Sequence, residues 1–154
     1  MDAKLINPVL ETMVSVLSTM ANVKPQLGKP KLKADEVALG HVTGIMSMVS
    51  PKMRASLAIS FSESAIIDLV KRMLGEDITE VDDTARDMAG EMTNMVVGGA
   101  KNLYAEQGYD FDMSSPKLLL GKDHTVHHEF AGQTIVLPFS ADAGEFFVEI
   151  CFEE

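Results

Sequence analysis

Residues 87–101 read DMAGEMTNMVVGGAK, and they form the middle of the longest helix that the sequence predicts. At about 100° per residue, Met88, Ala89, Met92, Met95 and Val96 fall on one broad apolar face suited to a protein core. A narrow stripe on the opposite face contains Asp87, Glu91, Asn94, Gly98 and Lys101, all within about 40° of Asp87. The stretch therefore predicts a core helix with one distinct polar face.

The ordinary interpretation of such a stripe is a solvated helix face. The composition of this stripe indicates a further role, because Asn94 is a poor helix former at a position where Glu, Lys or Ala would be more favourable. Gly90, Gly98 and Gly99 each cost about 1 kcal/mol relative to Ala in a helix interior. These residues indicate close approach, either by a neighbouring element or by a partner protein that contacts Gly98 beside Glu91 and Asn94.

The residue types in the stripe limit the chemistry that it can perform. A carboxamide such as that of Asn94 can orient a water molecule by donating and accepting hydrogen bonds, without itself titrating. This is the water-positioning role of phosphoryl transfer, in which catalysis is mostly alignment and charge stabilisation. The Glu91 carboxylate, one turn away, could pair with a cation of the substrate. The sequence has no phosphate-binding loop or metal cage, so the substrate would have to supply those parts.

The spacing of the apolar residues changes at the C-terminal end of this helix. We expect the helix to run from about Asp82 to Gln107, with Asp82 or Thr79 as its N-cap and Gly108 at the C′ position. Beyond Gly108 the apolar residues alternate with a period of about 2, which is typical of strands. Four short strands are expected at residues 117–121, 125–130, 134–139 and 146–152.

The N-terminal half predicts two further helices and two strands. A first helix is expected over residues 7–22, with Asn7 as N-cap and Pro8 at N1, followed by a linker over 23–33. Strands are expected over 37–49 and 54–61, joined by a hairpin turn. A helix should then run from Ser62 to Gly75.

These elements predict an α+β fold. Their order, αββααββββ, favours a single antiparallel sheet packed against helices, with the long central helix carrying the site. Residues 1–154 are a suitable length for one domain, and the sequence contains no internal repeat.

The composition excludes several classes of protein. A hydrophobic fraction of 46% is too high for a disordered chain. A net charge of −10 argues against a nucleic-acid binder, which must neutralise phosphates, and against adsorption on anionic membranes. We expect no signal peptide, because the first residues lack its basic and long apolar regions, and no membrane span, because no segment has the roughly 20 apolar residues that cross a bilayer. Together with the single Cys151, expected to be buried, this predicts a cytoplasmic protein.

Three histidines suggest a metal site at first sight. On an alternating strand, His124 and His128 would share one face while His127 would point to the other, which is poor geometry for a single ion. No nearby cysteine completes a ligand set, so no metal site is expected.

The motif in the long helix resembles a known family signature. Asp87-x-x-x-Glu91-x-x-Asn94 is similar to the [Asp/Ser]-x-x-x-Glu-x-x-Asn pattern of the CheC/CheX/FliY family of chemotaxis phosphatases. The resemblance continues in the Asn7-Pro8, Lys29-Pro30 and Gly108-Tyr109 pairs, at Arg72–Gly75 and at Pro116. The chain contains no second Glu-x-x-Asn, which favours the CheX type over the two-motif CheC type.

The resemblance implies an enzyme whose substrate is a protein, the phosphorylated response regulator CheY. It implies that Asn94 orients water for attack on the aspartyl phosphate and that Glu91 engages the active-site lysine of the regulator. Asp87 would be an accessory residue at the rim, and Gly98 and Lys101 would contact the partner. The regulator would supply Mg²⁺, and the phosphatase would need no cofactor of its own. It also implies a homodimer joined through the sheets.

The alternative is a non-catalytic module that binds a response regulator or a component of the flagellar switch through the same helix face. The intact Glu91 and Asn94 pair favours the enzyme, because a pure binding module would not need the carboxamide.

Overall fold

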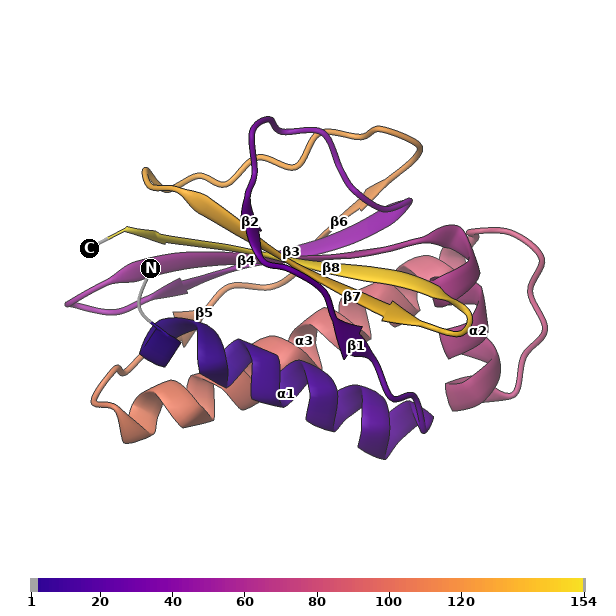
Figure 1. The fold of residues 1–154 in the computed structure, drawn as a ribbon, viewed down its shortest axis with the longest axis horizontal. Coiled ribbons are helices and arrows are strands. Elements are labelled where there is room, and N and C mark those ends of the chain that lie inside the picture. Colours follow the sequence, from indigo (N-terminus) through magenta and orange to yellow (C-terminus); the bar gives the residue numbers. More distant parts are fainter. Residues whose placement is uncertain (1–2, 154) are drawn as a thin grey trace.

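The structure, a computed structural model, describes residues 3–153; residues 1, 2 and 154 of the expected domain lie outside the described part. The described residues form three helices and one eight-stranded antiparallel sheet, so the predicted α+β class is confirmed. The helices α1 and α3 run side by side across one face of the sheet, and α2 lies at one end (Figure 1). In chain order the elements are α1 (Ala3–Ala21), β1 (Gln26–Leu27), β2 (Lys31–Leu32), β3 (Val42–Val49), β4 (Arg54–Phe61), α2 (Glu63–Leu74), α3 (Asp83–Glu106), β5 (Asp112–Met113), β6 (Lys117–Leu120), β7 (Thr134–Ala141) and β8 (Gly144–Glu153).

Two long hairpins meet at the centre of the sheet. Its order is β1-β7-β8-β4-β3-β5, with β2 also paired to β7 and β6 also paired to β3. The predicted β3–β4 hairpin is confirmed, with Val42 opposite Phe61 and Val49 opposite Arg54. The strands β4 and β8 join the hairpins along their full length, which creates one continuous surface for the helices.

The fold repeats one arrangement that the sequence does not reveal. A helix and two short strands precede each hairpin: α1, β1 and β2 before β3–β4, and α3, β5 and β6 before β7–β8. The short strands of each half pair with the hairpin of the other half. Each half therefore completes the sheet edge of the other, and α1 and α3 occupy corresponding places beneath the sheet.

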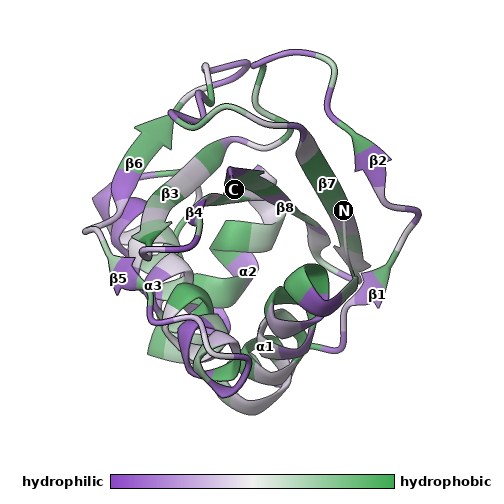
Figure 2. Cartoon of the chain, turned by 90° about the vertical axis from the view of Figure 1, so that its left-hand side faces the viewer, coloured by the Kyte–Doolittle hydropathy of each residue, from purple (hydrophilic) through white to green (hydrophobic). Residues whose placement is uncertain are grey.

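The main core lies between the helices and the sheet. Buried side chains from α1, such as Val9 and Met13, and from α3, such as Met92 and Val96, face Leu57 and other apolar residues of the central strands. The sheet arches over the helices, and hydrophobic residues continue along β7 and β8 (Figure 2). This packing places α3 in contact with both the sheet and α1.

The opposite face of the sheet is covered by loops. Residues 33–41 and 121–133 cross it and meet at one bridge between Val37 and Thr125. Beneath them lies a small apolar cluster of Ala38, Ala58 and Val126. As expected, Cys151 is buried, and burial raises the pKa of its thiol.

The prediction that α1 begins at Asn7 is wrong. The helix begins at Ala3 and contains Pro8, which has no N–H to donate to the carbonyl of Lys4. The side chain of Gln107 supplies a donor instead, with Nε2 2.8 Å from that carbonyl oxygen. The Tyr104 hydroxyl likewise donates to the Leu5 carbonyl. Donors from α3 therefore stabilise a helical turn that the local sequence does not predict.

Several strand boundaries also differ from the predictions. The expected linker 23–33 contains β1 and β2, β3 begins at Val42 rather than at 37, and the two-residue β5 was not expected. Such short edge strands are too brief to show an alternating pattern. Residues 125–130 contain no strand, because this loop is held by side-chain bonds of its histidines.

Candidate active site

Local signals fix the two ends of α3. The Asp82 side chain accepts a hydrogen bond from the backbone N–H of Ala85 at 3.1 Å, so the predicted N-cap is confirmed. At the other end, Gly108 adopts a φ of 90°, and the N–H of Tyr109 donates to the Tyr104 carbonyl at 3.1 Å. Glycine adopts this left-handed conformation without a steric penalty. The helix therefore extends as the sequence predicts.

Two glycine contacts place α3 in the fold. Thr93 packs on Gly44 of β3, where a Cβ would lie 2.9 Å from the Thr93 Cβ. Gly99 packs on Thr12 of α1, where a Cβ would lie 2.5 Å from the Thr12 Cγ2. The close approach expected at Gly99 is thus made within the chain, while Gly90 would bring a Cβ only to 3.4 Å from Leu118.

The structure brings the predicted stripe together on the outer face of α3. Asp87, Glu91 and Asn94 are exposed, whereas Gly98 and Lys101 are half-buried. Within residues 3–153, the side chains of Asp87, Glu91, Asn94 and Lys101 form no hydrogen bond or ion pair. Hydrogen-bonding groups without internal partners on a rigid helix are available to a ligand or a partner protein.

At Gly98 the polar stripe has no side chain, so the helix backbone is uncovered. No heavy atom lies within 4 Å of the position that its Cβ would occupy, so the fold itself does not require a glycine here. The cost of a glycine in a helix interior is therefore not explained by packing inside the chain. An external surface that comes close to the helix backbone beside Asn94 would explain it.

The three histidines at 124, 127 and 128 form hydrogen bonds on the loop-covered face of the sheet. His128 Nε2 lies 3.1 Å from Glu149, whose other oxygen is 2.9 Å from Lys33 Nζ. His124 Nε2 lies 2.6 Å from the Thr43 hydroxyl, and the exposed His127 pairs with Glu36. Across residues 3–153, no group of three or more His, Cys, Asp or Glu side chains is arranged to hold a metal ion.

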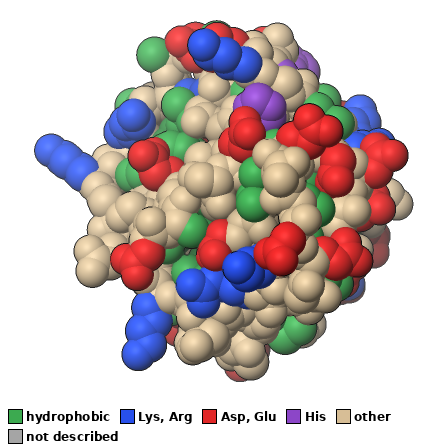
Figure 3. Space-filling view, turned by 90° about the vertical axis from the view of Figure 1, so that its right-hand side faces the viewer, with side chains coloured by type: hydrophobic (Ala, Val, Ile, Leu, Met, Phe, Trp, Pro, Cys, Tyr) green, Lys and Arg blue, Asp and Glu red, His purple; other side chains and the backbone are tan. Residues whose placement is uncertain are grey.

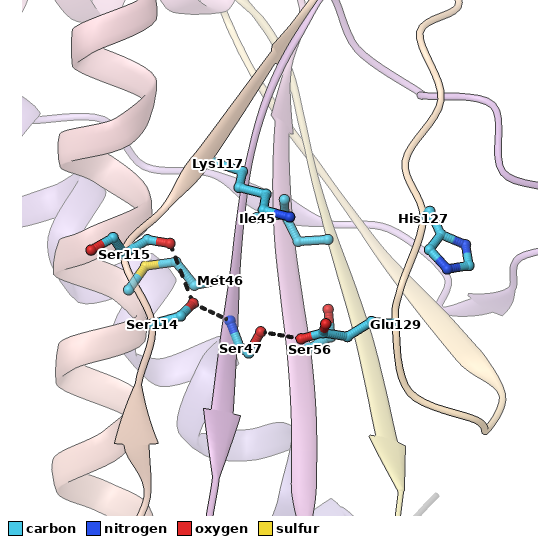
Figure 4. A pocket seen from close by; sticks show the side chains of 9 residues that line it. All are labelled: Ile45, Met46, Ser47, Ser56, Ser114, Ser115, Lys117, His127 and Glu129. Carbon is cyan, nitrogen blue, oxygen red and sulfur yellow. Dashed lines mark hydrogen bonds between the residues drawn. The ribbon is translucent and has the colours of Figure 1, made fainter.

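A hollow of about 360 Å³ opens on the same loop-covered face (Figure 4). Ser47 donates to Glu129 at 2.7 Å across it, and the Ser47 backbone N–H donates to Ser114 Oγ at 2.9 Å. Ser47 points away from α3, because Gly44 on the alternate side of β3 contacts that helix. The hollow therefore takes no part in the polar stripe.

Acidic side chains are prominent at one end of the molecule (Figure 3). The end of the molecule formed by α2 and the α2–α3 loop carries acidic side chains with Lys and Arg side chains among them (Figure 3). No helix in residues 3–153 is long and apolar enough to cross a membrane. An acidic surface of this kind repels other acidic proteins at long range, so an acidic partner would have to be recognised by local contacts.

Comparison with known proteins assigns the chain to a family. The family model described as chemotaxis phosphatase CheX matches residues 42–140, which include the whole motif of α3. The chain belongs to the CheX family.

Solved structures and a curated relative agree with this membership. The chemotaxis protein CheX from Vibrio vulnificus is 44% identical, with a TM-score of 0.91 over 98% of this chain and 100% of that chain. The CheY-P phosphatase CheX from Thermotoga maritima is 24% identical over 148 residues, which are 96% of this chain and 94% of that protein.

A more distant structure has the same fold. The structure of the CheX-CheY-BeF3-Mg²⁺ complex from Borrelia burgdorferi contains a chain that is 22% identical, with a TM-score of 0.80 over 97% of this chain and 98% of that chain.

Sequence reasoning found the residues on the outer face of α3 but missed those that support it. Gly44, Thr93 and Thr12 determine how α3 is seated, and none of them was expected near the site. The glycine pair at 98 and 99 was a partial signal, because a helix tolerates an interior glycine mainly where something approaches closely. The sequence could not show that only Gly99 is covered by the fold itself.

Proposed function

We propose that this protein is a phosphatase that hydrolyses the aspartyl phosphate of a phosphorylated CheY-type response regulator. The observation that carries the proposal is the pair of Glu91 and Asn94, exposed without internal partners on the outer face of α3 in a member of the CheX family. The curated relative from Thermotoga maritima is a CheY-P phosphatase, which supports the same reaction here.

In the proposed reaction, Asn94 enters the phosphorylated site of the regulator and orients a water molecule. The water oxygen forms a bond to phosphorus as the bond between phosphorus and the aspartate oxygen breaks, so the products are inorganic phosphate and a free carboxylate. A neutral carboxamide suits this role, because it positions water without adding charge to an already anionic centre. Catalysis then rests mostly on alignment.

Glu91 holds the two proteins in register in this proposal. Its carboxylate is one turn from Asn94 and reaches the active-site lysine of the regulator, with which it forms a charge-assisted hydrogen bond. Asp87 assists at the rim of the interface. Gly98 lets the regulator approach the helix backbone, and Lys101 offsets the repulsion between two acidic proteins locally.

We propose that the regulator, not the phosphatase, supplies the Mg²⁺, which neutralises charge on the phosphoryl oxygens when bound. The complex from Borrelia burgdorferi contains CheY together with Mg²⁺, which supports this division. The buried lone Cys151 fits a reducing compartment, and we place the protein in the cytoplasm.

We also propose that the protein is a homodimer joined through its sheet. The short edge strands expose Leu27, Leu32 and Leu120, at 44%, 58% and 45% of their surface. Edge strands with exposed apolar residues favour pairing with another sheet edge. Light scattering after size exclusion should give twice the mass of the chain, and a monomer at micromolar concentration would contradict the dimer.

The experiment that tests the function follows the decay of a Mg²⁺-loaded, phosphorylated regulator with and without this protein. We expect phosphate release to accelerate in proportion to the protein added. Binding of the regulator without acceleration would contradict the enzyme and support the non-catalytic module.

A further inference from the structure

The helices α1 and α3 touch at a place with no Cβ on one side. Gly99 of α3 faces Thr12 of α1, and a Cβ at Gly99 would lie 2.5 Å from Thr12 Cγ2 and 3.3 Å from Thr12 Oγ1. Carbon atoms in good contact are about 3.5–4.0 Å apart. The glycine therefore lets the two helices lie closer together here than a residue with a Cβ would allow.

Thr12 cannot easily turn away from this contact. Its hydroxyl donates to the Pro8 carbonyl at 2.7 Å, and the residue is only 7% exposed. Rotating Cγ2 out of the way would break a buried hydrogen bond. A side chain at position 99 would therefore push α3 away from α1.

Hydrogen bonds also join the C-terminal end of α3 to the N-terminal turns of α1. Tyr104 of α3 and Gln107, which caps the C-terminal end of α3, donate to the carbonyls of Leu5 and Lys4, the second at 2.8 Å. These bonds hold the C-terminal turns of α3 in place. If α3 is pushed away from α1 at residue 99, the turns of α3 that precede residue 99 therefore tilt. Asn94 lies five residues earlier, about 7.5 Å along the helix axis. A change at the Thr12–Gly99 contact therefore moves Asn94 relative to the rest of the fold.

We propose that Thr12 and Gly99 are positioning residues for the phosphatase reaction, an inference that rests on the proposed function. Their contact determines the distance between α3 and α1. This distance in turn sets the position of Asn94 relative to the phosphorylated site of the docked regulator. Restoring a normal contact after a Gly99→Ala change requires a separation of about 1 Å. Misplacement of this size can reduce a rate by about 10²-fold when catalysis depends on alignment.

The test compares a variant that introduces a steric clash between α3 and α1 with a second variant that removes the clashing atom. Gly99→Ala introduces the Cβ, while Gly99→Ala with Thr12→Ser removes Cγ2, the nearest atom, and keeps the hydroxyl that bonds Pro8. Gly90→Ala is the control in the same helix, because its Cβ would lie 3.4 Å from Leu118 in ordinary contact. All variants are compared with the wild-type chain for folding by circular dichroism and for kcat and KM on the phosphorylated regulator.

We expect Gly99→Ala to fold and to lose at least about tenfold in kcat, with a smaller change in KM. Adding Thr12→Ser should return kcat to within about threefold of wild type, because the remaining nearest atom is at 3.3 Å. A crystal structure of Gly99→Ala should show α3 displaced from α1 by about 1 Å. Gly90→Ala should match the wild type.

Each failure has a distinct meaning. An inactive wild type would overturn the proposed function and this inference with it. An active wild type beside a folded Gly99→Ala variant with full kcat, or with an undisplaced α3, would overturn this inference alone. The same holds if Thr12→Ser does not restore kcat, or if Gly99→Ala fails to fold and the double variant is folded but inactive.

Discussion

The side chain of Thr93 lies directly against Gly44, so the helix that carries Asn94 rests on β3 at a position where the strand has no side chain. The Thr93 hydroxyl also donates to the Ala89 carbonyl at 2.7 Å, which fixes the side chain in this position. Because Thr93 precedes Asn94, the contact that buries one residue points the next toward solvent.

We predict that Gly44→Ala destabilises the fold by about 1–3 kcal/mol, the usual cost of overpacking a tight core. The added Cβ would lie 2.9 Å from the Thr93 Cβ and 3.3 Å from the Ala89 carbonyl oxygen. Urea unfolding followed by circular dichroism measures the change. An unchanged unfolding midpoint would show that α3 adjusts freely on the sheet.

A second prediction separates stability from partner binding at Gly98. The change Gly98→Ala should stabilise the chain by about 0.5–1 kcal/mol, because alanine is the better helix former. Its Cβ would meet no heavy atom within 4 Å inside the chain. Affinity for the regulator, measured by calorimetry, should nevertheless fall, since the Cβ projects where the partner approaches. A stabilised variant with full affinity would count against a role for Gly98 in docking.

Glu91→Ala should weaken the complex with the regulator by about tenfold or more, because a charge-assisted hydrogen bond contributes about 1.5–3 kcal/mol. Calorimetry with a Mg²⁺-loaded regulator measures the affinity. The control is Glu106→Ala, which removes an equal charge from an exposed position on the same helix, outside the stripe. Equal affinities for both variants and the wild type would contradict the docking role of Glu91.

A fourth prediction concerns the loop-covered face of the sheet. Lys33 and Glu149 form an ion pair at 2.9 Å, with side chains 6% and 0% exposed. Lys33→Met should cost about 3–5 kcal/mol, because it leaves a buried carboxylate with an incomplete set of partners. Lys71→Met removes an exposed ion pair to Asp77 at 3.5 Å and should change stability by less than about 0.5 kcal/mol. Similar urea midpoints for the two variants would show that the buried pair contributes little.

The sequence predicts those parts of the fold that are determined locally. The helix α3, with its Asp82 cap and Gly108 end, and the helix α2, with its Ser62 cap and Gly75 end, follow from capping residues and apolar spacing. The β3–β4 hairpin follows from alternation and a turn. The stripe that contains Asn94 follows from helical geometry alone.

The remaining features depend on contacts between distant residues. The start of α1 was mispredicted because Gln107, far away in the chain, serves the Lys4 carbonyl that Pro8 leaves without its usual donor. Residues 125–130 alternate like a strand, but His128 instead bonds Ser56 and Glu149 beneath the loop. No local pattern encodes which residues will meet in this way, and the same limit applies to Thr12 and Gly99.

The most direct test of the account is single-turnover dephosphorylation of the regulator at saturating concentrations of wild-type protein and of Asn94→Ala, with affinity measured in parallel. The Asn94 side chain is exposed and forms no hydrogen bond within residues 3–153, so its truncation should leave the fold intact. We predict that Asn94→Ala binds the regulator within about threefold of wild type but loses about 10²-fold or more in the rate of phosphate release. An Asn94→Ala variant that dephosphorylates the regulator as fast as wild type would contradict the mechanism.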